Sequence, residues 1–275
     1  MAHSLRYAVN CSILFTELPL LERPAAVRDA GFDAVEFWWP FAESVPADRD
    51  VDAFVSAVCD AGVQLVGLNF AAGDMPGGDR GLVSWPARAA EFRDNVDVTI
   101  GIGDRLGCRA FNALYGNRVD GVDPAAQDEL GAEQLAVAAR AAARIGGTVL
   151  VEPVSGAPRY PLLTAADVLA VLDRVREEHG AMDLGLLADL YHLAVNGDDV
   201  DTVIADSVGR IAHVQIADAP GRNEPGTGEL ALERQLTDLE AAGYRGWVAL
   251  EYRPSAASTE QSLGWLPRPR RAASA

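Results

Sequence analysis

The chain has 275 residues, of which 49% are hydrophobic and 23% charged, and its formal net charge is −17. A chain of this length buries roughly three quarters of its unfolded surface, so the fold needs no disulfide or structural metal. The negative balance argues against nucleic acid as a partner, because binding a phosphate backbone needs a cationic surface.

Lysine does not occur in the sequence, so all 23 basic residues are arginine. Arginine keeps its proton and does not act as a Schiff-base nucleophile. The composition therefore excludes pyridoxal-phosphate enzymes, lysine-dependent aldolases and the lysine of a phosphate-binding P-loop.

Three widely spaced cysteines, with no C-x-x-C pair, favour a reducing compartment. The first ten residues lack the apolar region of a signal peptide, and no run approaches the ~18 apolar residues of a membrane span. We therefore expect a cytoplasmic protein without a membrane partner. The oligomeric state stays open, a homo-oligomer included.

Short apolar runs alternate with longer helical patterns along the chain. The expected strands are 7–14, 34–39, 64–70, 110–116, 148–154, 184–192, 211–218 and 247–252. The helices expected after the first seven strands are 19–30, 51–62, 86–106, 124–145, 164–180, 199–208 and 232–242.

The strands are almost continuously apolar, which indicates burial on both faces of a parallel sheet. Eight strand–helix units predict an α/β protein with a single (β/α)8 TIM barrel over residues 1–257. A doubly wound sheet would need a glycine-rich phosphate loop after the first strand, where the sequence reads CSILFTELPLL. We expect residues 258–275 to form a C-terminal segment, with a disordered tail from residue 267.

Oxygen-bearing side chains end four consecutive predicted strands: Glu152, Asp189, Gln215 and Glu251. Barrel enzymes carry their catalytic residues at these carboxyl ends. Buried carboxylates are costly without partners, and one divalent cation would stabilise all of these groups together. Hard oxygen ligands favour Mg²⁺ or Mn²⁺ over Zn²⁺. Taken singly, each carboxylate could instead pair with an arginine or cap a loop.

Further side chains are candidates for contact with a substrate. His192 follows Asp189 by three residues, and Arg222 lies in a loop, 217–230, that could close as a lid over a substrate carboxylate. Glu36 and Asn69, near the ends of the second and third strands, complete this set.

The sequence also suggests positions for several aromatic and histidine residues. Trp38, Trp39 and Phe41 could wall a pocket or simply pack. Side chains of a strand alternate between its faces, so His213 should point to the same side as Gln215, two residues later, and lie one layer deeper in the barrel. We expect it to be a structural or supporting residue. We expect His3 and His179 at the surface.

The sequence resembles the hydroxypyruvate isomerase family, within the xylose-isomerase-like barrels of sugar isomerases and epimerases. The resemblance spans about residues 5–254. It is carried by GFDAVEFWWPF, LNFAAGDMPGGDRG, VEPVSGAPRYPLL, ADLYHL, HVQIADAPGRNEPGTGE and GYRGWVALEYRP. Two residues depart from the family pattern: Asn223 stands where relatives often have His, and Ser155 where many have Asn.

The resemblance implies that Glu152, Asp189, Gln215 and Glu251 bind the metal. It implies a metal-assisted 1,2-proton shift that converts hydroxypyruvate to 2-hydroxy-3-oxopropanoate (tartronate semialdehyde), with Glu152 and Glu251 as the catalytic acid and base. The order of these two roles stays open. The alternatives are an isomerase or epimerase of 2-oxo-tetronate or another short keto sugar, a non-catalytic ligand-binding barrel, and a DNA endonuclease of the same superfamily.

Overall fold

The structure, a computed structural model, describes residues 3–272. Eight parallel strands form a closed barrel in sequence order, and β8 pairs with β1. The strands are β1 Arg6–Asn10, β2 Ala34–Phe37, β3 Gln64–Asn69, β4 Ala110–Asn112, β5 Thr148–Val151, β6 Leu184–Asp189, β7 Ile211–Ile216 and β8 Trp247–Leu250. The predicted (β/α)8 barrel is confirmed.

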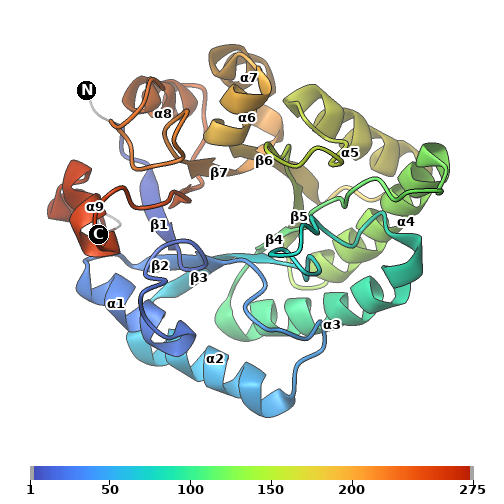
Figure 1. Cartoon of the computed structure of the whole chain (residues 1–275), viewed down its shortest axis with the longest axis horizontal. Coiled ribbons are helices and arrows are strands. Elements are labelled where there is room, and N and C mark those ends of the chain that lie inside the picture. Colours follow the sequence, from blue (N-terminus) through green and yellow to red (C-terminus); the bar gives the residue numbers. More distant parts are fainter. Residues whose placement is uncertain (1–2, 273–275) are drawn as a thin grey trace.

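Helices surround the barrel (Figure 1) and pack apolar side chains against the strands. The α-helices are α1 Arg23–Asp29, α2 Asp48–Ala61, α3 Ala89–Leu106, α4 Pro124–Ala143, α5 Ala165–His179, α6 Leu190–Asn196, α7 Val200–Ser207, α8 Leu232–Ala241 and α9 Thr259–Ser262. The 3-10 helices are η1 Leu20–Glu22, η2 Pro86–Arg88, η3 Val208–Arg210, η4 Leu263–Trp265 and η5 Arg268–Arg270. Within the described residues, none of the helices is both long and apolar enough for a bilayer.

Several strands end earlier than the sequence predicts. β6 ends at Asp189, whereas the predicted strand continues to residue 192. The Asp189 carboxylate accepts a hydrogen bond from the backbone N–H of Tyr191 and so caps α6, a helix that the sequence pattern does not predict. His192 therefore lies in the first turn of a helix, directly beside the end of β6.

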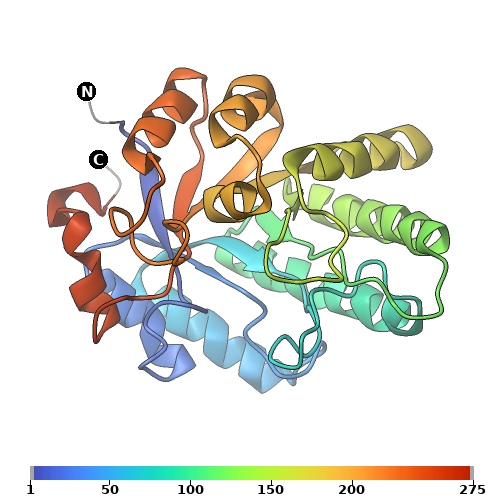
Figure 2. The ribbon, with the colours of Figure 1, turned by 45° about the horizontal axis from the view of Figure 1, so that its top comes forward.

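The C-terminal segment lies beside α1, as both views of the ribbon show (Figures 1 and 2). Arg268 and Arg271 donate hydrogen bonds to the carbonyl oxygens of Asp29 and Ala30, which end α1 without helical partners. Part of the predicted tail, Arg268–Arg270, forms η5, and these hydrogen bonds join it and Arg271 to the end of α1. Residues 273–275 of the predicted tail lie outside the described residues.

His3 is buried, which corrects the expectation of a surface residue. Only 5% of its surface is exposed. Its Nδ1 accepts a hydrogen bond from the N–H of Leu5, and its Nε2 lies 3.1 Å from the Tyr7 hydroxyl. These partners satisfy the imidazole inside the protein, so burial carries little penalty.

Candidate active site

The four predicted ligand side chains share the carboxyl end of the barrel. Glu152 directly follows β5, Asp189 ends β6, Gln215 lies in β7 and Glu251 directly follows β8. Asp189 and Gln215 are partners in the register of β6 and β7. None of the four is more than 7% exposed. The closed parallel ladder brings these groups together because all strand ends meet at one rim.

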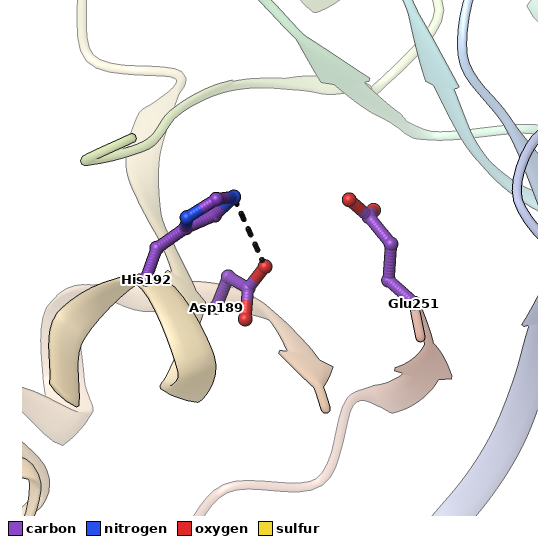
Figure 3. Close-up of side chains that lie close together, drawn as sticks. All are labelled: Asp189, His192 and Glu251. Atoms are coloured by element: carbon purple, nitrogen blue, oxygen red, sulfur yellow. Dashed lines mark ion pairs between the residues drawn. The ribbon is translucent and has the colours of Figure 1, made fainter. Parts of the chain in front are cut away.

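One ligand atom each of Asp189, His192 and Glu251 lies within 4.8 Å of the others. In Figure 3 their polar ends point toward a common space, and His192 Nε2 lies 3.5 Å from Asp189 Oδ2. The Arg222 Nη2 atom reaches both carboxylates, at 2.6 Å from Glu251 Oε1 and 3.6 Å from Asp189 Oδ2. A positive group therefore already fits between these two acids.

Burial shifts the acidity of both glutamates. Burial, reinforced by the charge of Asp189, raises the pKa of Glu152 to about 8, while a hydrogen bond from Asn112 opposes the shift. Burial also raises the pKa of Glu251 well above its ordinary value, although Arg222 opposes this shift. Burial is the largest cause of both shifts, so the protein surroundings stabilise the charged form of each glutamate less than water does.

The imidazole of His192 is oriented by Ser155. The backbone N–H of Ser155 donates to His192 Nδ1 at 3.0 Å, and the Ser155 hydroxyl lies 2.6 Å from the same nitrogen. A ring nitrogen that accepts an N–H carries no proton, so the proton of the neutral ring is on Nε2. Burial lowers the pKa of His192 to about 4, which keeps the ring neutral near pH 7. His192 therefore presents an N–H donor and is poorly suited to bind a cation through Nε2.

The donor set fits a hard divalent cation. Asp189 Oδ2 and Gln215 Oε1 are buried and have no hydrogen-bond partner, although the other polar atom of each side chain is paired. A buried oxygen that accepts no hydrogen bond is destabilising, and for Asp189 Oδ2 the nearest donors, His192 Nε2 and Arg222 Nη2, lie 3.5 and 3.6 Å away. A cation in front of these oxygens removes that penalty. Carboxylate and amide oxygens are the ligands that suit Mg²⁺ and Mn²⁺.

A cavity of about 1200 Å³ adjoins the cluster. Of the predicted substrate-binding residues, Asn69, His192 and Arg222 line it, together with Glu152 and Glu251. Its apolar wall includes three aromatic side chains that the sequence left undecided between wall and core, Trp38, Trp39 and Phe41. The cavity thus places carboxylates, an N–H donor and a guanidinium around one space.

Glu36, which the sequence predicts to contact a substrate, is not among the residues that line this cavity. Only 3% of its surface is exposed, and protein donors occupy both carboxylate oxygens. Asn10 and Gln215 donate to Oε1, and His213 Nε2 lies 2.7 Å from Oε2. Glu36 therefore faces the barrel interior, where His213 occupies the deeper position that the strand period predicts.

The loop that carries Arg222 is fastened by Asp218. Both carboxylate oxygens of Asp218 accept backbone N–H groups, those of Ala219, Gly226, Gly228 and Leu230. Arg222 itself has a positive φ of 56°, which is unusual for a residue other than glycine. The sequence predicts a lid here, whereas the structure shows a loop tied to the end of β7.

Two asparagines at the site were not among the sequence candidates. Asn10 bridges the carboxylates of Glu36 and Glu251, and Asn112 donates to Glu152 at 3.2 Å. Asn10 ends β1 and Asn112 ends β4. The sequence places both residues inside predicted strands, 7–14 and 110–116, and the strand-end rule finds them only once the observed ends are known.

Known proteins resemble the chain over nearly its whole length. A family model described as "Xylose isomerase-like TIM barrel" matches residues 24–268. A Streptomyces coelicolor protein named "Putative hydroxypyruvate isomerase" is 56% identical over 98% of each chain. A Cupriavidus necator protein named "2-oxo-tetronate isomerase" is 35% identical over 95% of this chain and 97% of that one. A Brucella melitensis crystal structure titled "AP endonuclease, family 2" is 35% identical, covers 95% of this chain and 97% of its own, and has a TM-score of 0.85.

Proposed function

The chain belongs to the xylose isomerase-like TIM barrel family, and we propose that it is an aldose–ketose isomerase that interconverts hydroxypyruvate and 2-hydroxy-3-oxopropanoate. The observation that carries this proposal is that buried Glu152, Asp189, Gln215 and Glu251 share one end of the barrel, where Arg222 contacts Asp189 and Glu251 and where Glu152 and Glu251 line a cavity. The name of the relative that is 56% identical supports the three-carbon keto acid as substrate.

We propose that Glu152, Asp189, Gln215 and Glu251 hold Mg²⁺ or Mn²⁺. Such a cation would supply Lewis-acid polarisation of the substrate carbonyl and stabilise the negative charge that develops when a carbon loses its proton. The two buried oxygens that accept no hydrogen bond, Asp189 Oδ2 and Gln215 Oε1, support this ligand set. His192 stays outside it because Ser155 keeps the ring proton on Nε2.

The chain's own side chains bind the substrate and move its protons. Arg222 pairs with the substrate carboxylate, and the Nε2–H of His192 donates to a substrate oxygen. One of Glu152 and Glu251 removes a proton from C3 of hydroxypyruvate, and the other returns a proton to C2. With the hydroxyl proton passing from O3 to O2, C3 becomes an aldehyde and C2 a secondary alcohol.

A four-carbon keto acid is the second candidate substrate. The cavity of about 1200 Å³ is far larger than a three-carbon acid, and one relative is named for 2-oxo-tetronate. The same proton shift would act on either compound. Comparing kcat/KM for hydroxypyruvate and 2-oxo-tetronate on one preparation decides between them.

DNA cleavage fits the chain less well, although one similar structure is titled as an endonuclease. The net charge of −17 opposes binding to a phosphate backbone. Retention of the chain on duplex DNA at low salt would contradict this reading. A non-catalytic barrel would bind the keto acid without converting it, which the turnover assay detects.

Metal removal tests the proposed function directly. Protein treated with EDTA and then freed of the chelator should lose turnover of hydroxypyruvate, because the polarising cation is gone, and added Mn²⁺ should restore it. Proton NMR of the substrate follows the reaction, and elemental analysis follows the metal content. Full turnover by protein shown to be free of metal would contradict the proposed cation.

A further inference from the structure

We propose that Glu36 is a positioning residue that orients the ligand atoms of Gln215 and Glu251 from beneath the site. The proposal rests on the proposed cation site and adds a role to a residue that does not line the cavity. Glu36 would set which atom of the Gln215 amide faces the cation. It would also help to hold the Glu251 carboxylate in place.

The neighbouring strands leave room for the Glu36 side chain to extend across the barrel. Glu36 lies in β2, in register with Asn10 of β1 and Gly67 of β3. A Cβ atom at position 67 would lie 3.0 Å from Glu36 Oε2 and 3.1 Å from Glu36 Cβ. Glycine at this position therefore leaves the room through which the carboxylate reaches β7.

The orientation of the Gln215 amide follows from its contact with Glu36. The two ends of an amide are nearly equal in shape, but one end donates and the other accepts. Glu36 Oε1 lies 2.7 Å from Gln215 Nε2, and a carboxylate only accepts, so the amide nitrogen must face Glu36. The amide oxygen then faces the other way, where it is buried without a partner. Without Glu36 the amide is free to turn and present its NH₂ group, which cannot ligate a cation.

Asn10 extends this control to Glu251. The Asn10 Oδ1 atom accepts the backbone N–H of Ser12 at 2.9 Å, so its NH₂ group must face the carboxylates. That group donates to Glu36 Oε1 at 2.8 Å and to Glu251 Oε2 at 2.9 Å. One NH₂ group thus holds the two acids together, while the other Glu251 oxygen turns toward Arg222.

His213 anchors the second oxygen of Glu36. The His213 Nε2 atom lies 2.7 Å from Glu36 Oε2, and both side chains are only 4% exposed. Because a carboxylate accepts, this nitrogen donates its proton to Glu36. Donors from β1 and β7 therefore hold the carboxylate from both sides, and its position is set by the barrel itself.

The test measures Mn²⁺ binding to metal-free protein by isothermal titration calorimetry, without any substrate. Glu36→Met keeps the length of the side chain and removes the acceptor, so Mn²⁺ should bind about 10–100-fold more weakly. Glu36→Gln keeps one oxygen that can accept from Asn10 and Gln215. This variant should bind Mn²⁺ with nearly the affinity of the parent chain. The matched control is Gln134→Ala, which removes a fully buried polar side chain of α4 that hydrogen-bonds Arg93 and Ala89. The control should bind Mn²⁺ like the parent.

A second variant decides the question if Glu36→Met does not fold. Gly67→Ala keeps every polar group and displaces Glu36 by a few tenths of an ångström, so Mn²⁺ binding should weaken by a smaller factor. Combining Glu36→Met with Gln215→Ala should weaken binding by less than the product of the single effects, because Glu36 acts in part through Gln215. Circular dichroism verifies the fold of each variant.

The outcomes separate this proposal from the proposed function. Parent-like Mn²⁺ affinity in folded Glu36→Met, or in Gly67→Ala where the first variant does not fold, would overturn the positioning role alone. A parent chain that does not bind Mn²⁺ would overturn both proposals. A parent that binds Mn²⁺ and converts neither keto acid would contradict the substrate while the affinity comparison still decides the role of Glu36.

Discussion

Glu152 and glutamine have nearly the same shape, so replacing one with the other removes a charge and a proton acceptor with little change in packing. Glu152→Gln should reduce kcat by at least about 10²-fold, since one partner of the proton shift is lost. Initial rates with hydroxypyruvate and a circular dichroism melting curve measure activity and folding together.

Glu129→Gln provides the matched control for this variant. Glu129 is exposed on α4, and the same substitution there should leave the rate unchanged. A Glu152→Gln variant that turns over substrate near the parental rate would remove Glu152 from the catalytic pair.

Single residues differ in how much of their structure the sequence predicts. The types and strand-end positions of Glu152, Asp189 and Glu251 predicted that they would meet, because parallel strands end at one rim. The partners of Glu36, Asn10, His213 and Gln215, were not predicted. The ladder between β2 and β3 is irregular between Val35 and Glu36, and such an irregularity re-aims a side chain without leaving a mark in the residue pattern.

At the scale of elements, the loop after β7 depends on one carboxylate. In Asp218→Asn the amide nitrogen would face backbone N–H donors whichever way the side chain turns, so two of the four contacts fail. We expect a loss of about 1–3 kcal/mol in the free energy of unfolding and a rise in KM for the keto acid, because Arg222 is no longer held in place. Urea unfolding and steady-state kinetics measure the two effects.

Asp206→Asn is the control for the loop variant, since Asp206 is exposed on α7. Both measurements should match the parent in this variant. A loop variant with parental KM would show that Arg222 keeps its position without the four contacts of Asp218.

Elements with a clear apolar period were predicted within a few residues of their observed ends, as α3 and α5 show. Helix α6 was missed because it has only seven residues and begins inside an apolar run that reads as strand. The Asp189 cap that starts this helix is a local contact, but it forms only where the barrel ends the strand.

At the scale of the whole molecule, the C-terminal segment contributes to stability. Leu263 is fully buried in η4, and Leu263→Ala should lower the free energy of unfolding by about 2–5 kcal/mol because it leaves a cavity. Urea unfolding followed by circular dichroism measures this loss. Leu163→Ala is the control, since Leu163 is 44% exposed and its truncation should change stability by less than about 0.5 kcal/mol. Equal stability of the two variants would show that the segment packs on the barrel without stabilising it.

The sequence by itself determined the eight-stranded barrel and the oxygen-rich chemistry of its rim, because apolar period and residue type are local properties of the chain. Only the tertiary structure decided how these groups are oriented. Asn10 and Glu251, which share a hydrogen bond, are 241 residues apart, and Gln215 and Glu36 are 179 apart. Contacts of this range exist only once the barrel has closed, so the direction of an amide or a ring proton cannot be predicted from the local sequence.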